Sequence, residues 1–302
     1  MSLLDSRPGG PRPDGGPGDD LASLEAGLDA LETAPEEDRP AHRRLLSAAW
    51  PPALTVAVLL GLWELVYRAG VKPTYALPSP ADVGLVLLDQ VADGRLLGAM
   101  ATSLERGGLG FLAAVAIGTP LGLALATLTP LRRGLGPLVT GLQSLPSVAW
   151  VPAAIIFFGI GETAMYAVIL LGAVPSIANG LVSGLDQVPP LLRRVGQVLG
   201  ARGLTAARFV LLPAALPGYL GGLRQGWAFA WRSLMAAELI VNSPQLGEGL
   251  GQLLDQGRLL SDMSLVFAGI LGILVVGIAV ELLVFGPLER RALRRRGLAA
   301  TR

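Results

Sequence analysis

Six long apolar runs are the feature that most constrains what this sequence can fold into. About 20 apolar residues in a helix cross the hydrocarbon core of a bilayer, and a helix pairs its own backbone groups there. Charged residues make up 16% of the 302 residues, against roughly 25% in soluble domains. We therefore predict an all-α membrane protein with six transmembrane helices, at residues 50–69, 103–128, 135–158, 163–183, 218–241 and 264–285.

The distribution of Arg and Lys residues sets the expected orientation. Loops on the cytoplasmic side of a membrane carry an excess of these residues, and most of the 24 present here fall on one side if the N-terminus is inside. Both termini are then cytoplasmic. The expected organisation is a disordered or amphipathic tail at residues 1–47, a transmembrane domain at 48–287 with a cytoplasmic loop at about 184–217, and a basic tail at 288–302.

The cytoplasmic loop between the fourth and fifth runs has the pattern of a helical hairpin. Apolar residues recur at helical spacing on both sides of Gly200. Gly200 and Gly203 bracket a short turn in which a positive φ is available. Pro213 is expected to end the second helix, because a proline inside a helix removes a backbone hydrogen bond. A basic loop that only follows the positive-inside rule is the alternative interpretation.

The end of this loop also fits a longer spacing, namely a glycine, nine residues, an aliphatic residue, any residue, leucine and proline. Gly200, Val210, Leu212 and Pro213 meet it here. On this spacing the loop resembles the cytoplasmic "EAA" loop of bacterial ABC-importer permeases, although Arg194 stands where that family has glutamate. The resemblance implies that the loop docks onto a partner ATPase, through residues Arg194, Val195, Gly196, Gly200, Ala201, Arg202, Gly203, Leu204, Leu212 and Pro213.

Two further stretches carry the same resemblance. Residues 77–91 begin with Leu-Pro-Ser-Pro, and residues 142–162 hold two prolines inside an apolar run. Such breaks persist in a membrane only where other helices bury them or where they line a cavity. Together with the loop, these stretches resemble the permeases for nitrate, sulfonate, taurine and bicarbonate, over about residues 77–287. The candidate translocation-path residues at the break are Gln143, Ser144 and Pro146.

Two segments between the runs are expected on the outer side. Ser79 has the position of a helix N-cap, with Pro80 and Asp82 in the first turn. We therefore expect an amphipathic helix from residue 80 to about 91. The glycines at 247–251 are expected to form a flexible turn, followed by a short surface helix at 250–260.

The fifth run carries charged side chains that are costly in lipid. Arg232 lies near its middle and is expected to face the bundle interior or a cavity, whereas Arg224 is nearer the inner end and can reach the headgroups. Two interpretations of Arg232 stay open. It lines an anion path, or it pairs with a carboxylate of another span, the candidates being Glu64, Glu162, Glu238 and Glu281. The candidate path residues in this run are Trp231, Arg232 and Glu238.

Missing residue types exclude several classes of function. The chain has no Cys and a single His, which lies in the N-terminal tail. Neither a cysteine metal site nor a histidine-based triad in the membrane is therefore expected. A Walker A phosphate loop needs Gly-Lys-Ser or Gly-Lys-Thr, and this chain contains neither. We expect no catalytic residue, no metal site and no cofactor in this chain.

The resemblance implies the membrane subunit of an ATP-binding-cassette importer in a bacterial cytoplasmic (inner) membrane, not an enzyme, with ATP and Mg²⁺ bound by a partner ATPase. The implied partners are ABC ATPase subunits, a periplasmic or lipid-anchored substrate-binding protein, a second permease copy and the bilayer, with no nucleic acid. The expected substrate is a small anion, an aliphatic sulfonate or taurine before nitrate or bicarbonate. The alternative is a stand-alone secondary transporter or channel, which paired broken helices in inverted repeats would indicate.

Overall fold

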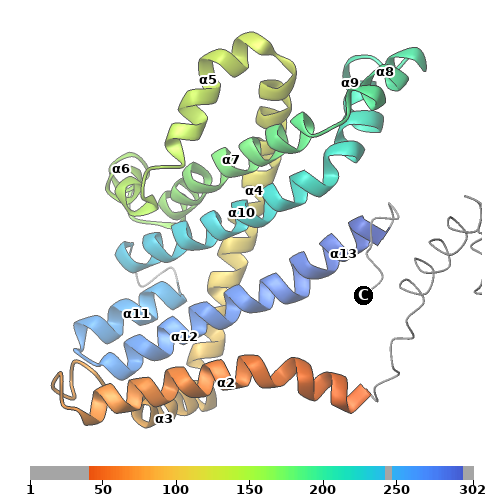
Figure 1. Ribbon diagram of the computed structural model, residues 1–302. Coiled ribbons are helices and arrows are strands. Elements are labelled where there is room, and N and C mark those ends of the chain that lie inside the picture. The colour runs from red at the N-terminus through yellow and green to blue at the C-terminus, as the bar shows by residue number, and fades with distance from the viewer. Residues whose placement is uncertain (1–40, 242–246, 295–302) are drawn as a thin grey trace, which may run out of the picture. The chain divides into compact units, whose positions relative to one another are not determined.

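The computed structural model describes residues 41–241 and 247–294, and every regular element within these ranges is a helix (Figure 1). Residues 1–61 and 62–302 form two units, which are described separately. The first unit contains most of α2 (Ala41–Arg68), while residues 1–40 of the predicted tail lie outside the described ranges. The second contains α3 (Pro80–Ala92), α4 (Arg95–Thr127), α5 (Thr129–Leu142), η1 (Ser147–Trp150), α6 (Val151–Phe158), α7 (Glu162–Asp186), α8 (Pro190–Val198), α9 (Gly203–Ala206), η2 (Ala207–Leu211), α10 (Leu212–Ile240), α11 (Leu250–Leu259), α12 (Met263–Val280), η4 (Glu281–Phe285) and α13 (Gly286–Arg294).

Four described helices are long and apolar enough to cross a membrane, and a fifth span is present if one bent pair counts as a single crossing. These helices match the first, second, fourth and sixth predicted runs. Helix α10 covers the fifth run and has 29 residues. It is less apolar than the four candidate spans, because its arginines, glycines and prolines lower its mean hydropathy. The count of six spans therefore stays a prediction.

The third predicted run, 135–158, is not one continuous helix. Helix α5 and the segment formed by η1 and α6 are bent by 102° relative to each other. The break falls between Leu142 and Ser147, where Pro146 has the extended backbone angles φ −61° and ψ 132°. The expected proline break is therefore present, but the segment is a broken span or a re-entrant loop.

Helices α4, α7 and α10 form the packed centre of the second unit (Figure 1). Glycines permit the close approach of α7 and α10. A Cβ at Gly218 would lie 2.7 Å from the Cα of Gly184, and a Cβ at Gly184 would lie 2.9 Å from the carbonyl oxygen of Ala215. Small residues four apart bring helix backbones together in membranes, where lipid tails are as apolar as leucine and packing drives association.

Of the two segments predicted on the outer side, α3 begins as expected, whereas α11 (Leu250–Leu259) is more buried than expected. The capping box of α3 is confirmed, because the Ser79 hydroxyl accepts from the Asp82 N–H at 3.0 Å and the Asp82 carboxylate accepts from the Ser79 N–H at 3.2 Å. Helix α11 was expected on the surface, but Leu250, Leu253 and Asp255 are buried, since it packs against α12 and α10. The described glycines at 249 and 251 also lie against Glu238, so they are part of the packed structure.

Pro213 does not end a helix, contrary to expectation. The backbone is helical without interruption from Gly203 to Ile240, through the π-helical turn η2. Leu212 donates its N–H to the carbonyl oxygen of Ala207. A π-turn shifts the hydrogen-bonding register by one residue, and Pro213, which has no N–H to donate, follows directly. The helix therefore continues through a proline in a place where the sequence predicted its end.

Candidate functional site

The predicted ATPase-docking loop folds as two short helices joined by a tight corner, and residues 190–211 are called the hairpin below. Helix α8 is followed by Gly200 with a φ of +81°, and α9 begins at Gly203 with a φ of +55°. The corner is closed by backbone hydrogen bonds from Gly200 to Gln197 at 3.0 Å and from Ala201 to Gly196 at 2.9 Å. The predicted turn with positive φ at both glycines is confirmed.

The inner side of the hairpin is held by close packing. A Cβ added at Gly196 would lie 3.0 Å from Cγ2 of Val210, so the glycine lets α8 lie against η2. Arg194 and Val195 precede it in α8 with exposed side chains, and Leu204 lies in α9. Leu212 at the start of α10 is half-buried against a small apolar cluster that contains Leu185.

The other side of the hairpin exposes large apolar side chains. Val198 is 87% exposed, Leu199 is 80% exposed and Phe209 is 68% exposed. Arg202 and Arg208 are also exposed beside them. Apolar residues that cluster at a surface with a charged rim are typical of a protein interaction site. The exposed residues of the hairpin therefore have a composition that is typical of an interaction surface.

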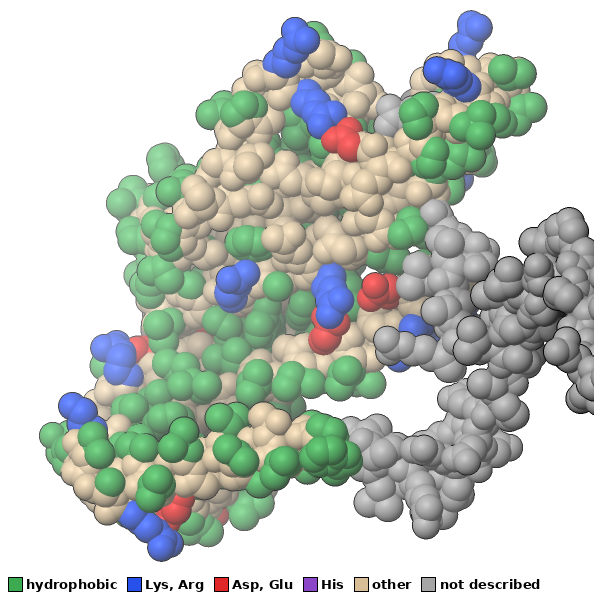
Figure 2. Space-filling model, viewed as in Figure 1, with side chains coloured by type: hydrophobic (Ala, Val, Ile, Leu, Met, Phe, Trp, Pro, Cys, Tyr) green, Lys and Arg blue, Asp and Glu red, His purple; other side chains and the backbone are tan. Residues whose placement is uncertain are grey.

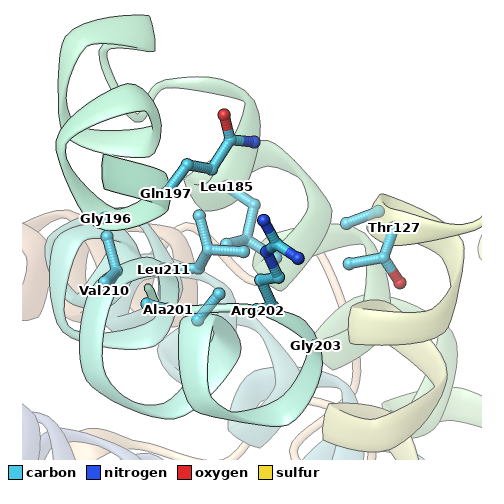
Figure 3. A pocket seen from close by; sticks show the side chains of 11 residues that line it. Thr127, Leu185, Gly196, Gln197, Ala201, Arg202, Gly203, Val210 and Leu211 are labelled. Atoms are coloured by element: carbon cyan, nitrogen blue, oxygen red, sulfur yellow. The ribbon is translucent and has the colours of Figure 1, made fainter. Parts of the chain in front are cut away.

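A cavity of about 580 Å³ separates the hairpin from the ends of α4 and α7. In Figure 3 the side chain of Arg202 extends into this space between Leu185 of α7 and Thr127 of α4. Four of the predicted docking residues meet at its walls: Gly196, Ala201, Arg202 and Gly203. The hairpin continues directly from η2 into α10.

Glu238 lies at the opposite end of α10 in a buried polar network, called the Glu238 cluster below. Its side chain has no exposed surface. Arg106 Nη1 donates to Oε1 at 3.0 Å, the Ser103 hydroxyl donates to Oε2 at 2.7 Å, and the Gly251 N–H donates to Oε2 at 3.0 Å. The Leu250 N–H donates in turn to the Ser103 oxygen at 2.8 Å. The cluster therefore ties α4, α10 and the start of α11 together.

A second cavity, of about 480 Å³, lies between α10 and α12 and is called the α10–α12 groove. Figure 2 shows basic and acidic side chains together in the hollow between these helices. The charged residues of its walls are Arg224, Arg232 and Glu281, and the indole rings of Trp227 and Trp231 form one side. The two rings stack with centroids 5.8 Å apart. Of the predicted path residues, the structure brings Trp231 and Arg232 together here.

The four carboxylates proposed as partners of Arg232 are each paired with another arginine. Glu64 pairs with Arg68, Glu162 and Glu238 pair with Arg106, and Glu281 pairs with Arg224. Within the described residues, Arg232 forms no ion pair. Its Nε donates to the carbonyl oxygen of Ala228 at 3.3 Å, and its guanidinium lies 4.8 Å from the centroid of the Phe229 ring.

The predicted path residues at the proline break lie elsewhere in the bundle. The Gln143 side-chain oxygen accepts from Asn179 of α7 at 3.1 Å, and the Ser144 hydroxyl donates to the carbonyl oxygen of Gly141 at 2.7 Å. Pro146 precedes η1, in which the Ser147 hydroxyl is 2.8 Å from that of Ser233 in α10. The break is thus held to both α7 and α10 by polar side chains.

Comparison with known proteins identifies the family. The model for the binding-protein-dependent transport system inner membrane component matches residues 118–290, which include α7, the hairpin, α10 and α12. The chain belongs to this family. It is a transport permease with an all-helical fold, and the resemblance of the loop to that of ABC-importer permeases is confirmed at the level of the family.

Three curated relatives of this permease are named for the transport of taurine, aliphatic sulfonates and nitrate. It is 34% identical over 268 residues, which is 84% of this chain and 94% of the relative, to the taurine transport system permease protein TauC of Escherichia coli (strain K12). It is 31% identical to the putative aliphatic sulfonates transport permease protein SsuC of Bacillus subtilis (strain 168), over 80% of this chain and 86% of the relative. It is 29% identical to the nitrate import permease protein NrtB of Synechocystis sp. (strain ATCC 27184 / PCC 6803 / Kazusa), over 74% and 84%.

A solved structure supports the fold of the permease. The MetNI methionine ABC transporter, in inward-facing conformations, has a chain that aligns with a TM-score of 0.53. The alignment covers 65% of this permease and 95% of that chain at 20% identity. The two chains share the type I importer fold, in agreement with the resemblance of the loop to ABC-importer permeases.

Sequence reasoning missed most of the Glu238 cluster of the permease. Arg106, Ser103 and Gly251 were given no role. A usable signal was present, because opposite charges inside separate apolar runs are expected to pair with each other. Arg106 in the second run and Glu238 in the fifth are such a pair.

Proposed function

We propose that this chain is the membrane-spanning subunit of an ATP-binding-cassette importer for a small anion. The substrate is an aliphatic sulfonate or taurine, or else nitrate or bicarbonate, received from a periplasmic or lipid-anchored binding protein. Two copies form the pore in a bacterial cytoplasmic membrane, each with six spans and both termini inside. Separate ABC ATPase subunits bind ATP and Mg²⁺ and dock on the hairpins.

The observation that carries the proposal is the exposed apolar hairpin built on a helix that also bears Arg232. Val198, Leu199 and Phe209 have no cover within the described chain, which a partner with an apolar groove would supply. The relatives named for taurine, sulfonate and nitrate support an anionic or sulfonate substrate. The uninterrupted backbone from Gly203 to Ile240 supports a mechanical link from the docking surface to the membrane.

In this proposal the predicted path residues act within the membrane. Arg232 and Trp231 lie at a cavity wall and are available to a passing anion. Gln143, Ser144 and Pro146 line or shape the path at the proline break. Glu238, which is buried and fully engaged, contributes by holding the end of α10 in place.

Reconstitution tests the proposal directly. The permease is purified together with its ATPase, and the complex is placed in proteoliposomes. ATP is supplied on the side of the ATPase, and the binding protein is added on the opposite side. We expect uptake of a radiolabelled sulfonate, taurine, nitrate or bicarbonate that requires both partners and ATP. Uptake by the permease alone, without any ATPase, would contradict the proposal and favour a stand-alone transporter.

A further inference from the structure

The α10–α12 groove combines features that point to an anion. Two guanidinium groups, Arg224 and Arg232, reach one cavity from the same helix. Gly221 and Gly277 are also part of its walls, and a Cβ added at either would have no neighbour within 4 Å. The cavity therefore has unfilled space next to positive charge.

Arg232 is the charged group in the groove that has no described carboxylate partner. A charge inside an apolar segment is costly and is usually compensated by a partner or by a water-filled cavity. The contacts of Arg232 are a carbonyl of its own helix at 3.3 Å and the face of Phe229. Most of its five N–H donors therefore have no acceptor among the described residues. The side chain is exposed to the groove.

A neutral donor lies beside this guanidinium. The indole N–H of Trp231 is buried and has no hydrogen-bond partner among the described residues. A buried donor that is left unpaired costs free energy comparable to a lost hydrogen bond. Trp231 and Arg232 both belong to the groove wall, so a side chain with an unpaired donor and a guanidinium lie at the same cavity.

We propose that the α10–α12 groove is the intramembrane binding site for a monovalent oxyanion, held first by Arg232 and then by Arg224. The proposal rests on the proposed function, and it names the site and the charge class of the substrate. The planar guanidinium fork binds two oxygens of one sulfonate, nitrate or bicarbonate group. Arg224 is a second station because Glu281 holds it by hydrogen bonds that an incoming oxyanion replaces.

The two arginines differ in their present partners, which separates them into two stations. Their Cα atoms are eight residues apart in α10, roughly 12 Å along the helix axis at 1.5 Å rise per residue. Arg232 has no carboxylate partner among the described residues, whereas Arg224 has such a partner in Glu281. The Nε of Arg224 donates to Glu281 at 2.8 Å, and a further bond joins the same two side chains, so the second station is occupied until the anion arrives.

The charges of the groove wall favour an anion of single charge. Arg224 pairs with Glu281 and its Nη1 also lies 3.8 Å from a carboxylate oxygen of Glu289, so the positive charge that stays uncompensated in the groove is that of Arg232. A monovalent anion neutralises it, whereas a divalent anion such as sulfate leaves uncompensated negative charge in a medium of low dielectric constant. Glu281 therefore acts as a selectivity residue as well as the partner of Arg224.

Tryptophan fluorescence tests binding in the groove without the binding protein. The probe is iodide, a monovalent anion that quenches indole fluorescence on contact, added to the purified permease in lipid nanodiscs. In a parent with Phe at the other tryptophans, only Trp227 and Trp231 report. We expect quenching that methanesulfonate relieves at much lower concentration than sulfate does. Arg232→Gln is expected to weaken the iodide effect and the methanesulfonate competition about tenfold, as loss of one charged hydrogen-bond partner does.

Three further variants keep this test decisive if Arg232→Gln folds poorly. Arg232→Lys keeps the charge but loses the fork, and we expect an intermediate affinity. Gly277→Leu fills the groove without displacing a neighbour and is expected to abolish competition by methanesulfonate. Gly108→Leu is the matched control, since a Cβ there also has no neighbour within 4 Å but lies outside the groove. Equal quenching and competition in wild type, Arg232→Gln and Gly277→Leu would overturn the proposal.

Glu281→Gln tests the charge rule. This variant removes one of the two carboxylates that pair with Arg224, which makes the groove more positive by one unit, and we expect the preference for methanesulfonate over sulfate to fall about tenfold or to reverse. An unchanged preference would refute the role of Glu281. These binding measurements are independent of the ATPase: if reconstituted wild type takes up no anion, the proposed function fails, and the quenching results still decide whether the groove binds anions.

Discussion

The two ends of the helix that runs from Gly203 to Ile240 treat polar and charged groups in opposite ways. At one end, the Glu238 cluster buries a carboxylate completely and surrounds it with donors from α4 and α11. At the other, the hairpin leaves arginines and large apolar side chains exposed. The comparison indicates that the Glu238 end is fixed by contacts within this chain, whereas the hairpin end leaves its large apolar side chains uncovered by the described residues.

The largest effect is expected from breaking the Glu238 cluster. Glu238→Ala leaves the Arg106 guanidinium and the Gly251 N–H buried without the carboxylate that they bind. Loss of one partner of a buried ion pair costs about 3–5 kcal/mol. We expect a much lower thermal unfolding temperature for the purified permease in detergent, with Glu248→Gln, at the exposed pair with Arg95, as control. Unfolding at the wild-type temperature would mean that this end is not the fixed one.

A somewhat smaller loss of stability is expected from the glycine contact of α7 with α10. Gly184→Val introduces atoms into a space where even a Cβ would lie 2.9 Å from the Ala215 carbonyl oxygen. Overpacking costs about 1–3 kcal/mol, and more where backbone must move. Gly221→Ala on the open face of α10 is the control, because its Cβ has no neighbour within 4 Å. If both variants unfold at the same temperature, close packing is not what joins these helices.

A substitution at the corner of the hairpin is expected to have a modest effect on stability. Gly200→Ala places a Cβ on a residue with φ +81°, which costs about 1–2 kcal/mol for a residue other than glycine. The strain falls on an exposed turn, so we expect little change in the unfolding temperature of the whole bundle and faster proteolysis within residues 190–211. Slower proteolysis than in wild type would show that the corner is not strained.

Changes at the exposed tip of the hairpin are expected to leave stability unchanged. Val198→Asp replaces a side chain that is 87% exposed, so it removes no packing within the chain. We expect wild-type unfolding but loss of ATPase co-purification, because a charge would be buried in the interface. Val71→Asp, at an exposed position between α2 and α3, is the control. Retained ATPase binding by Val198→Asp would show that this tip of the hairpin does not contact the ATPase.

The sequence predicted the helical class, the hairpin and the N-cap at Ser79 because each depends on local patterns. Apolar periodicity, positive-φ glycines and capping residues act over a few positions. The Glu238 cluster and the lack of a carboxylate partner for Arg232 among the described residues depend on which helices become neighbours. Arg232 could be placed in a cavity by its cost in lipid, but the pairing of all four candidate carboxylates with other arginines is a property of the assembled bundle.

Helix continuity through Pro213 was missed for a different reason. A proline is read as a stop because the turn before it loses a donor. Here η2 widens the turn, so Leu212 reaches Ala207 and the missing donor of Pro213 leaves the helix intact. Sequence periodicity does not distinguish a turn of this kind from an end.

The π-turn η2 has a mechanical consequence. From Gly203 to Ile240 the backbone is helical without a break, roughly 55 Å of helix at 1.5 Å per residue. In the proposed importer, a displacement of the hairpin is passed along this one helix toward the end that the Glu238 cluster holds. The displacement is expected to diminish in that direction, so Arg224 is expected to move farther than Arg232.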